Sequence, residues 1–199
     1  MNSISLARES SQEMKPDHSA EKELLQAAQR FDQKALGQIY DLYSPGLHRY
    51  AARFLGDPSV AEDCVADTFS RFLNTLRAGR GPQDFLKAYL YRIAHNWIVD
   101  YYRRAKDVSE LKDTHPGEED LPEQEVNLRI RQERVRKAIR GLTRDQQRVI
   151  GLKYLEGWEN EEIAQALHKP VGAVKSLQHR ALSSLKRILE KEKSSEQKP

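Results

Sequence analysis

The spacing of the apolar residues constrains this fold more than any other feature of the sequence. Over residues 20–106 and again over 127–191, apolar side chains recur at intervals of three and four, as in Leu24, Ala28 and Phe31. That spacing follows the period of an α-helix and places the apolar side chains on one face. No segment alternates apolar and polar residues as a half-buried strand does. The pattern therefore predicts an all-α protein.

Composition and charge divide the chain into two small helical domains and three polar segments. Residues 1–19 are polar and aperiodic, which predicts a disordered arm. Residues 107–126 hold one lysine against eight acidic residues, together with two prolines. Such a segment cannot bury a core, so we expect a flexible acidic linker between domains at 20–106 and 127–191. The polar residues 192–199 are expected to form a disordered tail.

Turn signals mark the helix ends expected in the first domain. The helical pattern begins at Glu21 and breaks near Asp32, and Ser44-Pro45-Gly46 predicts a kink or a close restart. Two further helices are expected over 60–76 and 85–105, on either side of a loop that carries two glycines, a proline and arginines. The first domain is thus predicted to hold four helices.

In the second domain, capping residues mark the helix starts. Thr143 and Gln146 form a capping-box pattern, and Asn160 is expected to cap the helix that follows Gly157. The last helix is expected to run from Gly172 to about residue 190.

Composition also excludes several classes of protein. A single cysteine leaves no internal disulfide framework and no cysteine-based zinc cluster. No run approaches about 18 apolar residues, and the N-terminus lacks the apolar core of a secretory signal, which predicts a soluble intracellular protein. The histidines lack metal-ligand spacing, and no metalloprotease, P-loop or paired-carboxylate motif occurs. We therefore predict no catalytic residue, no metal and no cofactor.

The strongest local signal lies at residues 161–176 and is typical of a helix-turn-helix. Ala164 is small where two helices would cross, His168 lies at the tight turn, and Val174 supplies the apolar contact beyond it. Apolar residues expected to fill the space between the helices are Ile163, Leu167 and Leu177. An ordinary antiparallel helix pair shares the Ala-to-Val spacing. Residues 127–193, however, hold 16 basic and eight acidic residues, a balance that favours a polyanionic partner.

Burial of Val174 and Ala181 would leave hydrogen-bonding side chains of the last helix exposed. These candidate DNA contacts are Lys175, Ser176, Gln178, His179 and Arg180. Such side chains can reach base edges or phosphates in a major groove.

Residues 85–104 carry six aromatic and four basic residues beside the loop that contains Arg77 and Arg80. Aromatic rings stack on unpaired bases and basic groups hold phosphates, so the pattern favours a single-strand binding face. For Trp97 we favour a place in the core, whereas the functional interpretation is stronger for Tyr91, Asn96 and the loop.

The helix at 62–72 joins an apolar stripe to exposed acidic residues and Arg71. Such a face suits either a partner helix or solvent, and spacing alone does not separate the two.

Together these segments resemble the extracytoplasmic-function (ECF) group of bacterial RNA polymerase sigma factors. The resemblance covers roughly residues 21–105 and 126–189. Within them, residues 35–73 and 85–104 are similar to the family's region two, and residues 142–189 are similar to region four. The resemblance implies a cytoplasmic bacterial protein that gives core RNA polymerase its promoter specificity. Members of the family are commonly held inactive by an anti-sigma factor, which is thus a candidate partner.

The resemblance also implies roles for particular residues. Residues implied to dock on the clamp helices of the polymerase β′ subunit are Asp63, Asp67, Phe69 and Arg71. Residues implied to open and hold the −10 element are Arg77, Arg80, Tyr89, Tyr91, Arg92, Asn96, Arg103 and Arg104. Residues implied to read the −35 element are Val171, Gly172, Ala173, Lys175, Ser176, Gln178, His179 and Arg180. The acidic linker would thread toward the polymerase cleft.

This sequence departs from the family's pattern at His168, where glycine is usual, and at Leu177-Gln178, where the order of polar and apolar residues is inverted. We therefore make no prediction of which promoter sequence is recognised. The alternative function is a stand-alone helix-turn-helix regulator, although a protein that binds only duplex DNA has no use for the aromatic helix. An enzyme acting on nucleic acid is disfavoured by the missing motifs.

Overall fold

The computed structural model describes residues 18–109 and 123–196, and every regular element within these ranges is a helix. The elements, in chain order, are α1 (His18–Gln29), α2 (Gln33–Leu55), α3 (Pro58–Arg77), α4 (Leu86–Ser109), α5 (Glu123–Arg140), α6 (Arg144–Ile150), the π-helical turn η1 (Gly151–Leu155), α7 (Asn160–Leu167) and α8 (Val171–Glu196). The predicted all-α class is confirmed.

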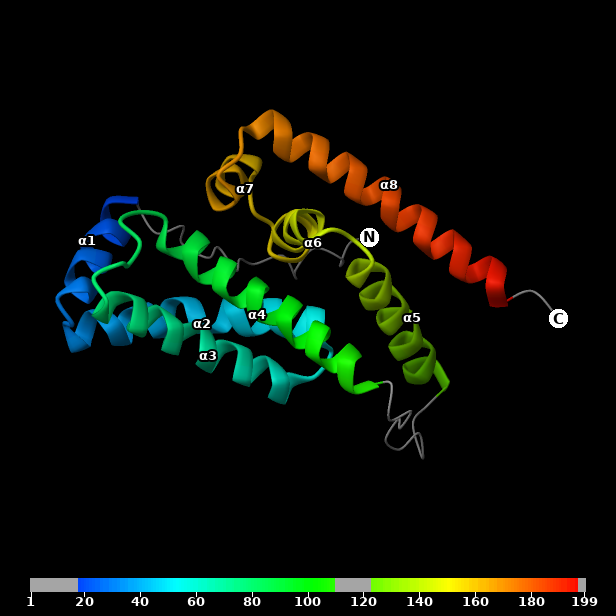
Figure 1. The fold of residues 1–199 in the computed structure, drawn as a ribbon, viewed down its shortest axis with the longest axis horizontal. Coiled ribbons are helices and arrows are strands. Elements are labelled where there is room, and N and C mark those ends of the chain that lie inside the picture. Colours follow the sequence, from blue (N-terminus) through cyan, green and yellow to red (C-terminus); the bar gives the residue numbers. More distant parts are fainter. Residues whose placement is uncertain (1–17, 110–122, 197–199) are drawn as a thin grey trace, which may run out of the picture.

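The first four helices form the N-terminal domain. α2, α3 and α4 pack on one another and α1 covers one end (Figure 1). Completely buried side chains at its centre include Ile39, Leu47, Phe72 and Leu90. The predicted break lies at Asp32, whose side chain accepts a hydrogen bond from the backbone of Ala35 and so caps α2.

Pro45 does not end a helix, contrary to one of the two outcomes that the sequence suggested. α2 continues through it as one element of 23 residues. Tyr43, Leu47 and Tyr50 are all buried on the same side of α2, and their packing keeps the helix in register on both sides of the proline.

The C-terminal domain consists of α5 to α8. α8 packs along α5, α6 and α7, and runs across the whole domain (Figure 1). The predicted capping box at Thr143 is confirmed, since its side chain accepts from the backbone of Gln146 while the Gln146 side chain accepts from the backbone of Thr143.

Several helices extend past the ends that the sequence predicted. α4 extends to Ser109 and α5 begins at Glu123, so both ends of the predicted linker are helical. α8 continues to Glu196, into the expected tail, and α1 begins at His18, inside the expected arm. The acidic and lysine-rich composition of these segments predicted non-helical chain. Charged residues, however, extend a helix readily once its start is packed. The rest of the arm, residues 1–17, and of the linker, residues 110–122, lies outside the described residues.

Two helix starts also differ from expectation. α7 is capped by Glu159, which forms a capping box with Glu162, and Asn160 is the first helical residue. α8 begins at Val171 rather than Gly172.

The two domains pack against each other as well as being joined through the chain. α7 contacts α4, and both α5 and η1 contact α2. Buried apolar residues of both domains form one continuous cluster, in which Tyr50 and Tyr91 of the first lie with Leu152 and Trp158 of the second. Sequence patterning predicted two domains but not this contact.

Candidate nucleic-acid interface

α7, the turn and α8 have the geometry of a helix-turn-helix. Ile163 and Val174 are completely buried where the two helices cross, and Ala164 and Leu167 are buried beside them. His168 ends α7 with a φ of 51°, in the left-handed region, so the chain turns sharply before Val171. The predicted helix-turn-helix core is therefore present, with histidine in a conformation that favours glycine.

The N-terminal half of α8 presents the predicted −35 residues on its outer side. Gly172, Lys175, Ser176, His179 and Arg180 are exposed, and the other predicted members, Val171, Ala173 and Gln178, are half-buried. An exposed helix with basic and hydrogen-bonding side chains matches the requirements for entering a major groove.

Gln178 forms a hydrogen bond with Asn160, which was predicted only to cap a helix. Its Nε2 donates to Oδ1 of Asn160 at 2.6 Å, which ties the first helix of the motif to the second. The side chain of Ser176 donates back to the Gly172 carbonyl at 3.0 Å. Asn160 was missed because its partner lies 18 positions away on another helix.

Apart from Tyr91, the predicted −10 residues form two groups in the structure. Arg77, Arg80, Arg103 and Arg104 are exposed, at the end of α3, in the following loop and near the end of α4. Tyr89, Arg92 and Asn96 are half-buried on α4. The Arg92 guanidinium lies 5.1 Å from the centre of the Tyr89 ring, a cation–π arrangement.

A cavity of about 340 Å³ separates this part of α4 from the helix-turn-helix. Arg80, Tyr89 and Arg92 line one side, and Gln165 and His168 line the other. Nη1 of Arg92 lies 3.4 Å from Nε2 of His168, so the predicted −10 face and the turn of the helix-turn-helix touch at the edge of the cavity.

Tyr91 differs from what the sequence led us to expect. It is 4% exposed, and its hydroxyl donates to Oε2 of Glu156 at 3.0 Å. Burial, and then the neighbouring carboxylate, raise the pKa of the Tyr91 hydroxyl above its ordinary value, so it remains a donor. The sequence around Tyr91 gives no sign of this cover, because the covering group belongs to the other domain.

Trp158 completes the cover over Tyr91. The two rings meet edge to face with centroids 5.0 Å apart, and Nζ of Lys87 lies 4.5 Å from the centre of the Trp158 ring. Neither Glu156 nor Trp158 was predicted as functional. The available signal was a large aromatic directly after the helix-ending Gly157, where solvent exposure would be costly.

The four residues predicted to dock on polymerase divide between surface and core. Asp63 and Arg71 are exposed, and Asp67 forms an ion pair with Arg71 at 2.5 Å. Phe69 is 8% exposed and packs against Tyr40 with ring centroids 4.8 Å apart. Phe69 therefore lies in the core beneath this surface and supports it by packing.

Nowhere in residues 18–109 and 123–196 do three histidine, cysteine, aspartate or glutamate side chains gather as metal ligands would. None of the helices described there is long and apolar enough to cross a membrane.

Comparison with known proteins matches both domains. The family model of Sigma-70 region 2 matches residues 39–108, and that of Sigma-70 region 4 matches residues 132–185. The ECF RNA polymerase sigma factor SigL of Mycobacterium tuberculosis is 31% identical over 161 residues, which cover 76% of this chain and 87% of SigL. The chain belongs to the ECF sigma factors. It is thus an alternative sigma factor that directs transcription initiation.

Other proteins resemble this sigma factor in sequence and in fold. The ECF sigma factor BldN of Streptomyces coelicolor is 31% identical over 172 residues, which cover 84% of this chain and 65% of BldN. The structure of CnrH in complex with the cytosolic domain of CnrY superposes with a TM-score of 0.59 at 24% identity, and covers 85% of this chain and 96% of that chain. The sigma factor RpoE of Bartonella quintana, in complex with the anti-sigma factor NepR, gives a TM-score of 0.51 at 24% identity, with 79% of this chain and 98% of that chain covered.

Proposed function

We propose that this sigma factor reads the −35 element through the N-terminal half of α8, and melts and holds the −10 element through the loop after α3 and one face of α4. The observation that carries the proposal is the exposed row Lys175, Ser176, His179 and Arg180 on a helix-turn-helix with a packed core. We place the domain boundaries at 20–106 and 127–191, and assign the chain no catalytic step of its own and a place in the cytoplasm.

The surface that binds core polymerase is assigned to α3. Asp63 and Arg71 are exposed on one helix, and the Asp67–Arg71 ion pair fixes the arginine there. Exposed charges at the rim of a protein–protein interface affect the association rate and the relative placement of the two partners more than the affinity. We therefore expect Asp63→Ala with Arg71→Ala to slow association with core polymerase while the helical content stays unchanged.

An anti-sigma factor is proposed as a further partner. CnrH was solved with the cytosolic domain of CnrY, and the Bartonella sigma factor with NepR, and these two complexes support such a partner for a chain of the same family and fold. Co-purification of the tagged sigma factor from its own host, followed by mass spectrometry, tests this assignment. Recovery of core polymerase subunits alone would oppose it.

Transcription in vitro tests the assignment of the DNA-binding surfaces. Purified chain and core RNA polymerase are combined on fragmented cognate genomic DNA, and the 5′ ends of the transcripts are mapped. We expect sharply defined starts that share two spaced upstream elements. Absence of new starts, together with binding of duplex DNA by the chain alone, would favour the stand-alone regulator.

Two matched variants then separate specific from general effects. Lys175→Ala removes an exposed charge from α8, whereas Lys34→Ala removes one from the exposed side of α2, far along the chain from either predicted DNA element. Loss of one phosphate contact should weaken promoter binding and lower the slope of log K against log salt by about one. Equal effects of the two substitutions would contradict the role of α8.

A further inference from the structure

We propose that the free sigma factor is closed by a contact between its two domains, which we call the interdomain lock, and that the lock covers Tyr91 on the −10 face of α4. The lock consists of Tyr50, Phe54 and Tyr91 from the N-terminal domain and Gly151, Glu156 and Trp158 from the C-terminal domain. The second half of the proposal rests on the assignment of α4 to the −10 element. The proposal that the two domains close on each other rests only on contacts within the chain.

Gly151 is the residue that permits the close approach. A Cβ at this position would lie 2.8 Å from ring atoms of both Phe54 and Tyr50. Both rings are buried, at 5% and 0% exposure, and cannot move aside without disturbing the core of the first domain. The absent side chain therefore lets the start of η1 lie directly against α2.

The backbone offers no other reason for glycine at this position. Gly151 has φ −60° and ψ −50°, ordinary right-handed helical values that any residue adopts. Inside a helix, glycine is about 1 kcal/mol less favourable than alanine. A glycine that weakens its own helix and is needed only for contact with the other domain indicates that the closed arrangement is a built feature.

Glu156 provides the polar part of the lock. Its side chain is 5% exposed, forms an ion pair with Arg53 at 3.3 Å, and accepts the Tyr91 hydroxyl at 3.0 Å. Arg53 also donates to the backbone carbonyl of Leu155. A buried carboxylate is costly unless it is paired, and both of these partners come from the N-terminal domain.

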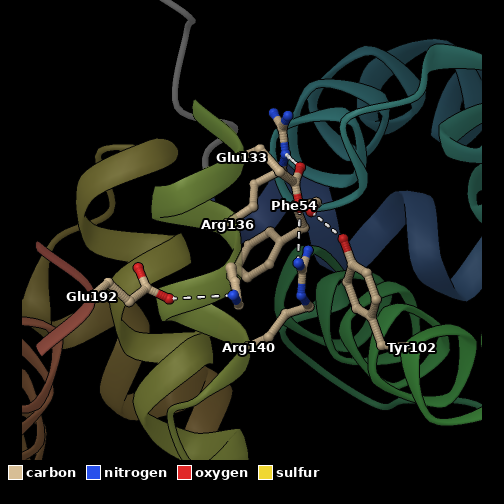
Figure 2. Close-up of polar contacts among 7 residues, drawn as sticks. Phe54, Tyr102, Glu133, Arg136, Arg140 and Glu192 are labelled. Carbon is tan, nitrogen blue, oxygen red and sulfur yellow. Dashed lines mark hydrogen bonds and ion pairs between the residues drawn. The ribbon is translucent and has the colours of Figure 1, made fainter. Parts of the chain in front are cut away.

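On the side of α5 the two domains meet at Arg140 of the C-terminal domain and Tyr102 of the N-terminal domain (Figure 2). Tyr102 donates to the backbone carbonyl of Phe54, and the Arg140 guanidinium lies 4.8 Å from the centre of the Tyr102 ring. Glu133 accepts from both Arg136 and Arg140 at 2.8 Å. Burial raises the pKa of Glu133, but the hydrogen bonds from the two arginines outweigh it and lower the pKa overall.

Closure has a direct consequence for DNA. Tyr91 is 4% exposed beneath Glu156 and Trp158, and Arg92 touches His168 across the edge of the cavity. A ring covered in this way cannot stack on an unpaired base. In contrast, Lys175 and His179 on α8 remain exposed. The closed protein thus presents its −35 surface while Tyr91 of its −10 face is covered, and the domains must separate before that ring can stack on a base of the −10 element.

A pair of glycine substitutions tests the lock. Gly151→Ala places a methyl group against Phe54 and Tyr50, whereas Gly37→Ala, also within a helix, meets nothing within 4 Å. Both substitutions favour the helix that contains them, so loss of the local fold is not expected from either. Far-UV circular dichroism checks that point.

The first measurement needs no DNA. The chain has two tryptophans, and Trp97→Phe leaves Trp158 as the sole reporter. Trp158 is 3% exposed in the closed state. In that background Gly151→Ala should increase acrylamide quenching of Trp158 and enlarge the radius of gyration measured by X-ray scattering, while Gly37→Ala should change neither. Unchanged quenching and radius in Gly151→Ala would overturn the lock.

The second measurement tests the covering of the −10 face. The probe is a fluorescein-labelled single strand of about 12 nucleotides that carries a mapped −10 element, used without polymerase. We expect Gly151→Ala to bind it about tenfold more tightly than the wild type. An opened protein with unchanged affinity would overturn the covering, and transcription with core polymerase then shows whether the sigma activity itself stands.

Glu156→Gln gives a second route to the same state. It keeps the shape of the side chain but removes the charge that pairs with Arg53 and accepts from Tyr91. We expect the same direction of change in quenching and radius. Unchanged quenching and radius in Glu156→Gln would overturn the role of Glu156 in the lock.

Discussion

The hydroxyl of Tyr50 lies 2.9 Å from Nδ1 of His95 in a completely buried hydrogen-bonded pair that joins α2 to α4. Nε2 of His95 is buried as well, and α6 of the other domain brings Arg144 and Arg148 toward the same ring. Burial first, and the two arginines next, lower the pKa of His95 to about 3. The ring is therefore neutral in the folded protein, which has a consequence for stability.

Stability should fall as the pH is lowered below neutrality. In the unfolded chain His95 titrates near 6.5, so between about pH 3 and 6.5 the unfolded state binds more protons than the folded state. The contribution is complete above about pH 6.5 and is lost progressively toward pH 3. From pH 7 to pH 5 we expect His95 to lower the free energy of unfolding by about 2 kcal/mol.

Urea unfolding at several pH values measures this effect. His95→Gln keeps a polar side chain but cannot take up a proton, so its stability should vary less with pH over this range than that of the wild type. The absolute stability of the variant is not the criterion, because it also alters the bond to Tyr50. Equal slopes for the two proteins would show that His95 does not control the acid dependence.

Cys64, the single cysteine of the chain, should be unreactive in the folded protein. Its thiol is completely buried and lies 3.7 Å from the Ala94 carbonyl, and burial raises its pKa to about 12. Because the thiolate is the reactive form, an aromatic disulfide reagent should modify Cys64 only through unfolding. The rate should rise with urea in step with loss of helical signal. Rapid labelling of the native protein would contradict the burial.

His168→Gly should stabilise the helix-turn-helix. His168 has a φ of 51°, where a side chain is strained and glycine is not, and its side chain is exposed. Relief of this strain should exceed the extra chain entropy that glycine brings to the unfolded state, for a net gain of about 0.5 kcal/mol. Thermal unfolding followed by circular dichroism measures the change. His168→Ala keeps a Cβ and should give no gain; a gain of equal size in both variants would point to loss of the imidazole instead.

Thr143→Ala should destabilise the C-terminal domain. The threonine and Gln146 satisfy each other's backbone N–H groups at the start of α6, and alanine leaves one of them without its partner. The expected cost is about 1 kcal/mol in urea unfolding. Ser70→Ala, at an exposed site within α3, serves as the control and should change stability little. Equal losses in both variants would exclude a capping effect.

Local patterns in the sequence were sufficient for the helices and for the DNA-reading motif. The period of the apolar residues predicted α2, α3, α4 and the helix-turn-helix, because most of the side chains that mark the period become buried, although Leu42 of α2 is exposed. Val174 and Ile163 are examples, both with no exposed surface. The interpretation of Trp97 as a core residue also agrees with its 8% exposure.

Tertiary structure alone decided which parts of the predicted DNA surface are accessible. Tyr91 is covered by Glu156, 65 positions further along the chain, and no periodicity within α4 carries information about that contact. The role of Gly151 in the contact between the domains could not be predicted from the sequence either. A glycine near a helix end ordinarily indicates that the helix terminates rather than that another element packs closely against it. The sequence by itself determined an all-α chain with a helix-turn-helix, because helix period and caps are local. The closure of one domain on the other was decided in three dimensions, because its partners meet only after both domains have folded.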